Sequence, residues 1–174
     1  MYSLIFNCED DYLKNVDIRR AIASCFNFGL IKTDFGTDAA SHIFPSALTI
    51  GSEPFGQLTQ SFKPYSTDNA KTVMRKGLNA IDKNKAEVVL LCKTADEVFA
   101  RKVIQNWQAT LGVIFNVSVE TTDEYTLQKR IRNGEYQLAL GEISYDGNSV
   151  QDAALRFTSG NRDNISNYSS TGYD

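Results

Sequence analysis

Apolar residues recur along the middle of the chain with two different periods, and each period predicts a different element. Residues 87–92 form an almost continuous apolar run, which is typical of a buried strand. Residues 94–111 carry apolar side chains at spacings of three and four, which is typical of a helix with one buried face. Residues 114–120 alternate apolar and polar side chains and predict a second strand. The apolar face of the helix consists of Phe99, Val103, Ile104, Trp107 and Leu111.

A strand, a helix and a strand joined by short links form a βαβ unit, which favours parallel pairing of the two strands. A second round follows, with a helix predicted over residues 123–133 and a strand over residues 135–140. A further short strand is predicted near the start of the chain, at residues 3–7. These elements indicate an α/β fold with a mixed sheet and helices on its faces.

Three more helices are predicted, over residues 16–26, 67–78 and 151–158. Glycine is favoured just beyond the end of a helix, so Gly29 and Gly77 are expected to end the first two. Side chains expected to cap helix starts are Thr67 or Asp68 for the second helix, and Thr94 with Glu97, as a capping box, for the helix in the middle of the chain.

Residues 33–65 differ from the rest of the chain, because they contain all three prolines and keep neither period for long. Their aromatic residues indicate that the segment packs against the domain and is not a linker. Loops this long are uncommon in compact domains and are often functional. We expect no domain boundary here, since 174 residues is also an ordinary size for one domain.

The composition is that of an ordinary globular protein, with 42% apolar and 22% charged residues, which excludes a disordered chain or a coiled-coil rod. The formal net charge is −3 and no basic stripe is present, so nucleic acid is not an expected partner. Apolar runs are only a few residues long, so no membrane-spanning segment is expected. The first ten residues lack the pattern of a signal peptide, so none is expected in this chain.

Candidate metal ligands are few and scattered. The three cysteines, Cys8, Cys25 and Cys92, lie far apart, and His42 is the only histidine. A structural zinc site needs four such ligands at short paired spacings, so we expect no metal and no other cofactor. The cysteines are interpreted as small buried apolar side chains.

Candidate catalytic groups are equally sparse. Any Ser-His-Asp or Cys-His site would have to use His42, and the chain has no G-x-S-x-G turn and no glycine-rich phosphate loop. The neighbouring carboxylates Glu9, Asp10 and Asp11 are interpreted as a solvated surface. A small hydrolase that uses His42 remains one alternative function, and a purely structural interaction domain remains a second.

A polar segment follows the strand predicted at residues 135–140. In open α/β sheets, ligands bind beyond the carboxyl ends of the strands. Tyr145, Asp146, Gly147 and Asn148 lie at such an end, where the Asp146 carboxylate is suited to a cationic group of a ligand. The same composition is also typical of a plain turn, so a ligand site and a turn both remain open.

Several segments, spaced in order along nearly the whole chain, are similar to motifs of one protein family. They are IFN at 5–7, NVDIRRA at 15–21, DAASHIFP at 38–45, NAKTVMRKG at 69–77, NWQATLGVIFNVSVE at 106–120, NGEYQLAL at 133–140, SYDGNSV at 144–150 and LRFTSGNRDNISNYSSTGYD at 155–174. Together they resemble the C-terminal lobe of the bacterial family 5 extracellular solute-binding proteins, the oligopeptide- and dipeptide-binding components of ABC importers.

The resemblance implies a single lobe of a type II periplasmic-binding-protein-like fold, with residues 1–174 forming a fragment of a longer two-lobe protein. A peptide or a related small solute would be bound between this lobe and the N-terminal lobe of the same parent chain. It would then be delivered to the permease subunits of the ABC transporter. Such a protein is not an enzyme. It acts outside the cytoplasm, in the periplasm or as a lipoprotein on the outer face of the cell membrane.

The resemblance also implies where the ligand lies. The peptide main chain would form strand-like hydrogen bonds with residues 142–146, and the Asp146 carboxylate would pair with the α-ammonium of the peptide. An aromatic residue often precedes the ligand aspartate in the family, and Ile143 stands at that place here. The candidate ligand-binding residues are Ile143, Ser144, Tyr145, Asp146, Gly147 and Asn148.

Overall fold

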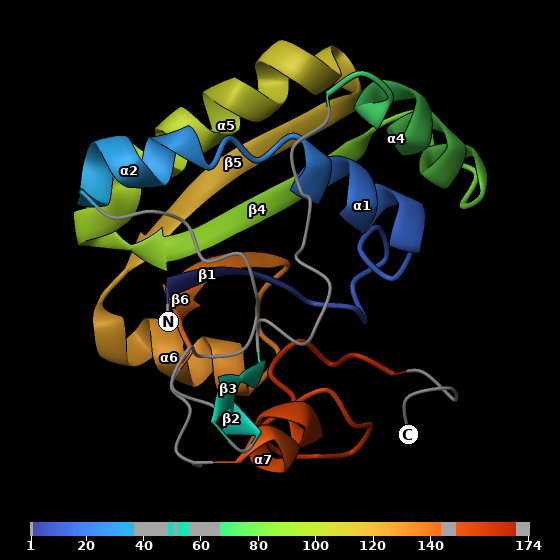
Figure 1. The fold of residues 1–174 in the computed structure, drawn as a ribbon. Coiled ribbons are helices and arrows are strands. Elements are labelled where there is room, and N and C mark those ends of the chain that lie inside the picture. The colour runs from blue at the N-terminus through green and yellow to red at the C-terminus, as the bar shows by residue number, and fades with distance from the viewer. Residues whose placement is uncertain (1, 37–48, 51, 56–66, 144–148, 170–174) are drawn as a thin grey trace.

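The chain is built around one four-stranded sheet with the strand order β1-β6-β4-β5, as the computed structural model shows (Figure 1). β4 runs parallel to both of its neighbours, and β1 runs antiparallel to β6 at one edge. The mixed α/β sheet expected from the sequence is thus confirmed. The strands are β1 (Tyr2–Phe6), β4 (Ala86–Lys93), β5 (Phe115–Thr122) and β6 (Leu138–Glu142). The structure describes residues 2–36, 49–50, 52–55, 67–143 and 149–169.

Helices cover both faces of this sheet. α5 lies on one face together with α1, α2 and α4, and α6 lies on the other (Figure 1). The helices are α1 (Val16–Ser24), α2 (Gly29–Phe35), α4 (Ala70–Asn79), α5 (Glu97–Leu111), α6 (Glu124–Arg132) and α7 (Val150–Leu155). The smaller elements are the 3-10 turns Thr94–Asp96 and Gly112–Ile114 and a hairpin of β2 (Thr49–Ile50) with β3 (Glu53–Pro54).

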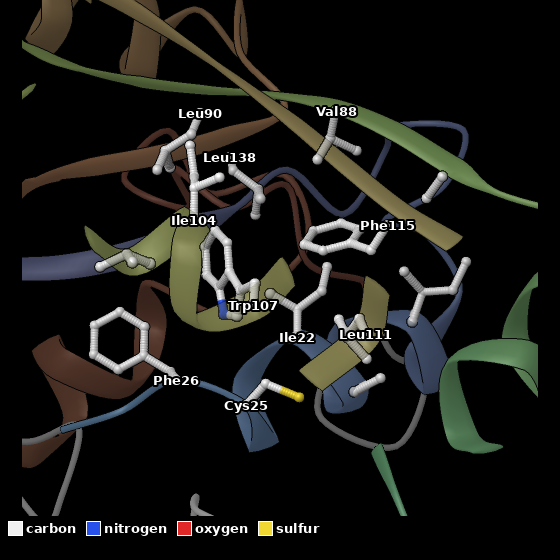
Figure 2. Close-up of a cluster of buried hydrophobic side chains, with 14 of the residues drawn as sticks. Ile22, Cys25, Phe26, Val88, Leu90, Ile104, Trp107, Leu111, Phe115 and Leu138 are labelled. Carbon is white, nitrogen blue, oxygen red and sulfur yellow. The ribbon is translucent and has the colours of Figure 1, made fainter. Parts of the chain in front are cut away.

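The larger core cluster fills the space between the sheet and α5. Trp107 lies fully buried at its centre (Figure 2). Its ring is edge-to-face with the rings of Phe115 of β5 and Phe26, at centroid distances of 5.7 Å and 6.4 Å. Leu90 and Leu138 contribute to the same cluster from β4 and β6. The expected packing of the α5 stripe against the sheet is therefore confirmed.

A smaller cluster fills the opposite face, between the sheet and α6. Leu91 of β4 points into it, whereas the adjacent Leu90 points into the larger cluster, because successive strand residues face opposite sides. α6 contributes Leu127 and Ile131. Burial on both faces explains why the sequence of β4 is almost continuously apolar.

Two of the predicted helix starts are wrong. Thr94 does not cap α5, because residues 94–96 form a 3-10 turn and the Thr94 hydroxyl donates to the carbonyl oxygen of Thr122, 3.2 Å away. α4 begins after Asn69 rather than at Thr67 or Asp68. In both places the predicted cap lies two or three residues before the first residue of the helix, instead of directly before it.

The two predicted glycine stops are also wrong. Gly29 is the first residue of α2, a helix that the sequence pattern did not predict, since none of its residues is buried and no apolar stripe marks it. Gly77 lies inside α4, which continues to Asn79. A Cβ atom on Gly77 would lie 2.7 Å from Cγ1 and 2.9 Å from the backbone nitrogen of Ile18. Gly77 thus permits the close approach of α4 to α1.

Gly77→Ala is expected to lower the free energy of unfolding by about 1–3 kcal/mol, because the added methyl group has no space against α1. Alanine is otherwise the better helix former by about 1 kcal/mol, so the sign of the change isolates the steric effect. Urea unfolding measures it. Thr72→Ala, at an exposed position of the same helix, is the control and should change stability by no more than about 0.5 kcal/mol. A Gly77→Ala protein as stable as the wild type would contradict the close approach.

Candidate functional site

The carboxyl ends of three strands meet at one edge of the sheet. β4, β5 and β6 run parallel and end at Lys93, Thr122 and Glu142, and the antiparallel β1 begins at the same edge with Tyr2. Open α/β sheets bind their ligands beyond this kind of edge. We refer to it below as the carboxyl edge.

The sheet divides as it approaches the carboxyl edge. β6 pairs with β4 only at Leu138 and Ala139. Beyond these residues β4 continues beside β5 to its last residue, and β6 continues beside β1 until Tyr2 pairs with Glu142 (Figure 1). The edge is therefore formed by two separate two-stranded halves, β1–β6 and β4–β5.

A cluster of polar side chains connects the two halves. The Tyr2 hydroxyl donates to Oδ2 of Asp96 at 2.5 Å, and Asp96 is buried. Nζ of Lys93 lies 3.8 Å from the same Asp96 oxygen and 3.4 Å from Oε2 of Glu124. It also lies 6.0 Å from the centroid of the Tyr2 ring, within the range of a cation–π contact.

The protonation states of this cluster are set by its surroundings. Burial, and then the hydrogen bond to Asp96, raise the pKa of the Tyr2 hydroxyl far above its usual range. Partial burial lowers the pKa of Lys93, but the carboxylates of Asp96, Glu124 and Glu142 outweigh burial, so that the pKa is raised. Tyr2 is therefore a neutral donor and Lys93 a cation at neutral pH.

Of the six predicted ligand-binding residues, the structure describes only Ile143. Its side chain is partly buried and packs against the smaller core cluster, directly after the end of β6. The other five predicted residues lie outside the described residues, as does His42 of the alternative hydrolase reading. These five are Ser144, Tyr145, Asp146, Gly147 and Asn148.

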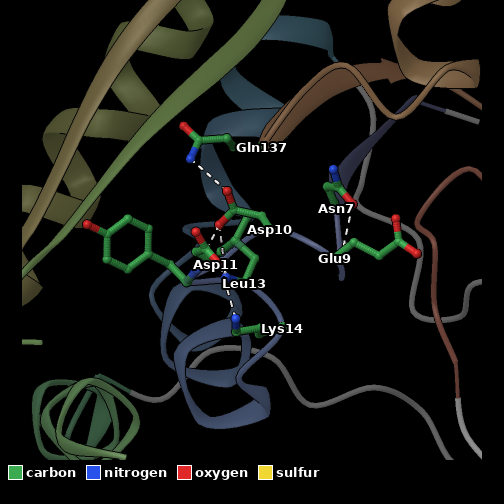
Figure 3. Close-up of polar contacts among 8 residues, drawn as sticks. Asn7, Glu9, Asp10, Asp11, Leu13, Lys14 and Gln137 are labelled. Carbon is green, nitrogen blue, oxygen red and sulfur yellow. Dashed lines mark hydrogen bonds and ion pairs between the residues drawn. The ribbon is translucent and has the colours of Figure 1, made fainter. Parts of the chain in front are cut away.

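The carboxylates that follow β1 differ from one another in environment (Figure 3). Glu9 and Asp11 are exposed, as expected, and Asp11 pairs with Lys14 at 3.0 Å. Asp10 departs from the expectation of a solvated surface, because it is partly buried and both its oxygens accept hydrogen bonds. Its Oδ1 accepts from the backbone N–H groups of Tyr12 at 2.9 Å and Leu13 at 3.1 Å. Its Oδ2 accepts from Nε2 of Gln137 at 2.7 Å. Asp10 thus stabilises the turn before α1.

A buried asparagine, Asn7, joins three parts of the chain. Its Nδ2 donates to the carbonyl oxygens of Gly134 at 3.1 Å and Tyr136 at 2.8 Å, and its Oδ1 accepts from Nδ2 of Asn167 at 3.1 Å. The sequence pattern gave Asn7 only as the end of a strand. Its real role depends on residues more than 120 positions away, so no local signal could reveal it.

A second buried asparagine, Asn164, organises the tail of the chain. Its Nδ2 donates to the carbonyl oxygens of Thr158 at 3.1 Å and Tyr168 at 2.7 Å, and its Oδ1 accepts from the Ser166 hydroxyl at 3.1 Å. The backbone N–H of Cys8 donates to the Ser166 carbonyl oxygen at 2.8 Å. The polar tail is therefore packed against the end of β1.

The cysteines are free thiols. Cys25 and Cys92 are buried, as expected, and burial raises the pKa of each to about 11. Cys8 is only partly buried, so for this residue the expectation of a buried apolar side chain is wrong. Within the part of the chain that the structure describes, no group of three or more His, Cys, Asp or Glu side chains is arranged to hold a metal ion.

A hollow of about 270 Å³ lies beside α6, away from the carboxyl edge. The polar side chains that line it already take part in hydrogen bonds within the protein. Nη1 of Arg130 donates to Oε1 of Glu120 at 2.5 Å, and Oε1 of Gln137 accepts from the backbone N–H of Val89 at 2.8 Å. The side chains of Arg130, Glu120 and Gln137 are therefore already engaged within the protein, and nothing about them points to a bound ligand.

The carboxyl edge is of the kind at which open α/β sheets bind ligands, and the family is given by sequence comparison. The family model of the bacterial extracellular solute-binding proteins, family 5 middle, matches residues 1–164. The chain belongs to this family, which consists of binding proteins. A comparison with curated protein sequences finds no match. Among the described residues, no helix has the length and apolar character needed to cross a membrane.

Solved structures of similar fold are peptide-binding proteins by their descriptions. OppA of Haemophilus influenzae in complex with the peptide RPPGFSPFR superposes with a TM-score of 0.82 at 20% identity, over 99% of this chain and 35% of that one. The substrate-binding domain of an oligopeptide ABC transporter from Bacillus anthracis gives 0.89 at 17% identity, again over 99% and 35%. A third structure, described as a peptide-binding protein of a peptide ABC transporter, gives 0.75 at 20% identity, over 98% and 78%.

Because their sequences are only 17–20% identical to this one, these structures establish the fold alone. The chain spans about a third of the length of the first two proteins. The third protein is much shorter, and the chain spans most of it.

Proposed function

We propose that the chain is a lobe of the substrate-binding component of an ABC importer, which binds peptides or a related small solute between two lobes and delivers them to a membrane permease. The observation that carries this proposal is the family match over residues 1–164. The intact protein acts outside the cytoplasm, in the periplasm or anchored by lipid to the outer face of the cell membrane.

In this proposal, residues 1–174 are the C-terminal ligand-binding lobe and the other lobe belongs to the same parent chain. The relatives of known structure are about three times as long, which leaves room for a second lobe. The large core on one face of the sheet and the smaller core on the other support independent folding of these residues. Independent folding is also supported by the third solved structure, because this chain spans 78% of that short protein.

The ligand contacts of this lobe are proposed to come from the segment Ile143–Asn148, which we call the ligand segment. It directly follows Glu142, the last residue of β6, and so leaves the sheet at the carboxyl edge. Main-chain groups of residues 142–146 would pair with an extended peptide, and such pairing tolerates many peptide sequences because it does not read side chains. The Asp146 carboxylate would hold the α-ammonium.

Calorimetric titration of peptides into the two-lobe protein and into residues 1–174 alone tests this proposal. The two-lobe protein is expected to bind its peptide with a Kd of about 1 μM or lower, whereas the single lobe should bind at least about a hundredfold more weakly. The reason is that the second lobe supplies much of the contact surface and excludes water on closure. A two-lobe protein that binds no peptide would refute the ligand. Equal affinity of the single lobe would refute binding between lobes.

A further inference from the structure

We infer that Tyr2, Asp96 and Lys93 hold in place the end of β6, from which the ligand segment continues. The three residues, which we call the edge clamp, join the two halves of the sheet where it divides. This inference rests on the proposed function, because the position of the end of β6 affects binding only if the ligand segment contacts the ligand.

The first step concerns what holds the end of β6. Its pairing with β4 stops at Ala139, so Leu140, Gly141 and Glu142 are paired laterally only with β1 among the described strands. The ligand segment begins at the next residue. The side chains of Leu140 and Ile143 pack against the two core clusters, but the only strand that pairs with Leu140–Glu142 among the described residues is β1.

The second step concerns what holds the start of β1. β1 lies at the edge of the sheet, so its only strand partner among the described residues is β6 itself. Tyr2, which pairs with Glu142, is fixed instead by its side chain. The centroid of its ring lies 5.5 Å from that of Phe35 and 6.5 Å from that of Phe99, and its hydroxyl donates to Asp96.

The third step concerns the acceptor. Asp96 is buried in the 3-10 turn between β4 and α5, so it moves with the β4–β5 half of the sheet. Lys93, the last residue of β4, balances its charge. The hydrogen bond from Tyr2 to Asp96 consequently spans the division of the sheet, and it connects the β1–β6 half to the rest of the lobe directly before the ligand segment.

Tyr2→Phe isolates this hydrogen bond, because it keeps the ring and its contacts and removes the hydroxyl. In the two-lobe protein it is expected to weaken peptide binding about tenfold, which corresponds to about 1.4 kcal/mol. In residues 1–174 alone, the backbone amides of residues 140–142 are expected to exchange with solvent faster than in the wild type, while those of Val88–Leu90 keep their rates.

Tyr136→Phe is the matched control. The Tyr136 hydroxyl is also partly buried and also bonded, to the carbonyl oxygen of Ile165 at 2.5 Å, but it lies before the start of β6 and not at the carboxyl edge. Both substitutions remove one bonded hydroxyl and should lower thermal stability to a similar extent. Only Tyr2→Phe should weaken peptide binding.

A pair of substitutions at the acceptor separates positioning from stability. Asp96→Asn keeps an oxygen that accepts from Tyr2 and should retain peptide affinity within about threefold of the wild type. Asp96→Leu removes the acceptor and should show the same tenfold loss as Tyr2→Phe. Combining Asp96→Leu with Tyr2→Phe should add little further loss, since both remove one bond.

Unchanged peptide affinity in Tyr2→Phe, with stability lowered as in Tyr136→Phe, would overturn the inference and leave the clamp a purely structural contact. Unchanged exchange of residues 140–142 would overturn it as well. The second readout needs no ligand. If the wild-type two-lobe protein bound no peptide, the proposed function would fail, while the exchange rates would still decide whether the clamp positions the end of β6.

Discussion

Replacing Asp146 with asparagine in the two-lobe protein is expected to weaken peptide binding by about two to three orders of magnitude. The resemblance to the family assigns this carboxylate to the α-ammonium of the peptide. Removing one member of a charge pair that is closed off from water costs roughly 3–5 kcal/mol, because the other charge is left without a partner. Each 1.4 kcal/mol corresponds to about a factor of ten in Kd. Calorimetric titration with one peptide measures the change.

Acetylation of the peptide provides the complementary test. A peptide without its α-ammonium should bind the wild type about as poorly as the free peptide binds the Asp146→Asn protein, and acetylation should cost the mutant little more. Asp11→Asn, at an exposed carboxylate whose partner is a surface lysine, is the control and should leave peptide affinity unchanged. The ion pair would be contradicted if the Asp146→Asn protein bound the peptide as tightly as the wild type, or if acetylation did not change the affinity of the wild type. Either result would favour a ligand other than a free-amine peptide.

Trp107→Ala is expected to lower the free energy of unfolding of residues 1–174 by about 3–5 kcal/mol. The indole is fully buried at the centre of the larger core, and its removal leaves a cavity between α5 and β5 as well as losing the ring contacts with Phe115 and Phe26. Urea unfolding followed by circular dichroism measures the change without relying on tryptophan fluorescence. Val98→Ala, at an exposed position of the same helix, should cost no more than about 0.5 kcal/mol.

Trp107→Phe should cost clearly less than Trp107→Ala. Phenylalanine keeps an aromatic ring in the core, and it removes an indole N–H that is buried and has no hydrogen-bond partner among the described residues. Wild-type tryptophan fluorescence should be that of an apolar environment. Emission typical of water-exposed indole in the folded protein, or equal costs for the two substitutions, would contradict this account of the core.

Strands and amphipathic helices were predictable because burial leaves a local mark on the sequence. β4 is apolar at almost every position because both of its faces are covered, and α5 shows a stripe because only one of its sides is. α2 escaped prediction for the converse reason, since none of its residues is buried. The spacing of apolar residues indicates which positions are buried. It therefore predicts a helix or a strand only where the element has a buried face.

Positions set by contacts between distant segments were not predictable in this way. Gly77 looks like a helix end, but its role is the close approach of α4 to Ile18, fifty-nine positions earlier in the chain (77 − 18). The hydrogen bond between Tyr2 and Asp96 joins residues 94 positions apart. Single-sequence patterns carry no information about such pairs, so sequence reasoning located the carboxyl edge without the clamp that crosses it.

The place of the predicted ligand site and the identity of its ligand group rest on different arguments. The order of strands and helices put residues 143–148 after a strand end, and the structure confirms that β6 ends at Glu142, on the edge where β4 and β5 also end. The identity of the ligand group came from resemblance alone, because a carboxylate beside a glycine is equally typical of a turn. Asp146 therefore stays a prediction that the peptide titrations above decide.

Small-angle X-ray scattering from the two-lobe protein, recorded with and without a saturating peptide, tests most directly whether this chain is one of two lobes that close on a ligand. Closure brings the lobes together, so the radius of gyration is expected to fall when peptide is added. Residues 1–174 alone should scatter identically in both conditions, which controls for effects of the peptide on a single lobe. A two-lobe protein whose radius of gyration stays unchanged at a peptide concentration that calorimetry shows to be saturating would contradict the account.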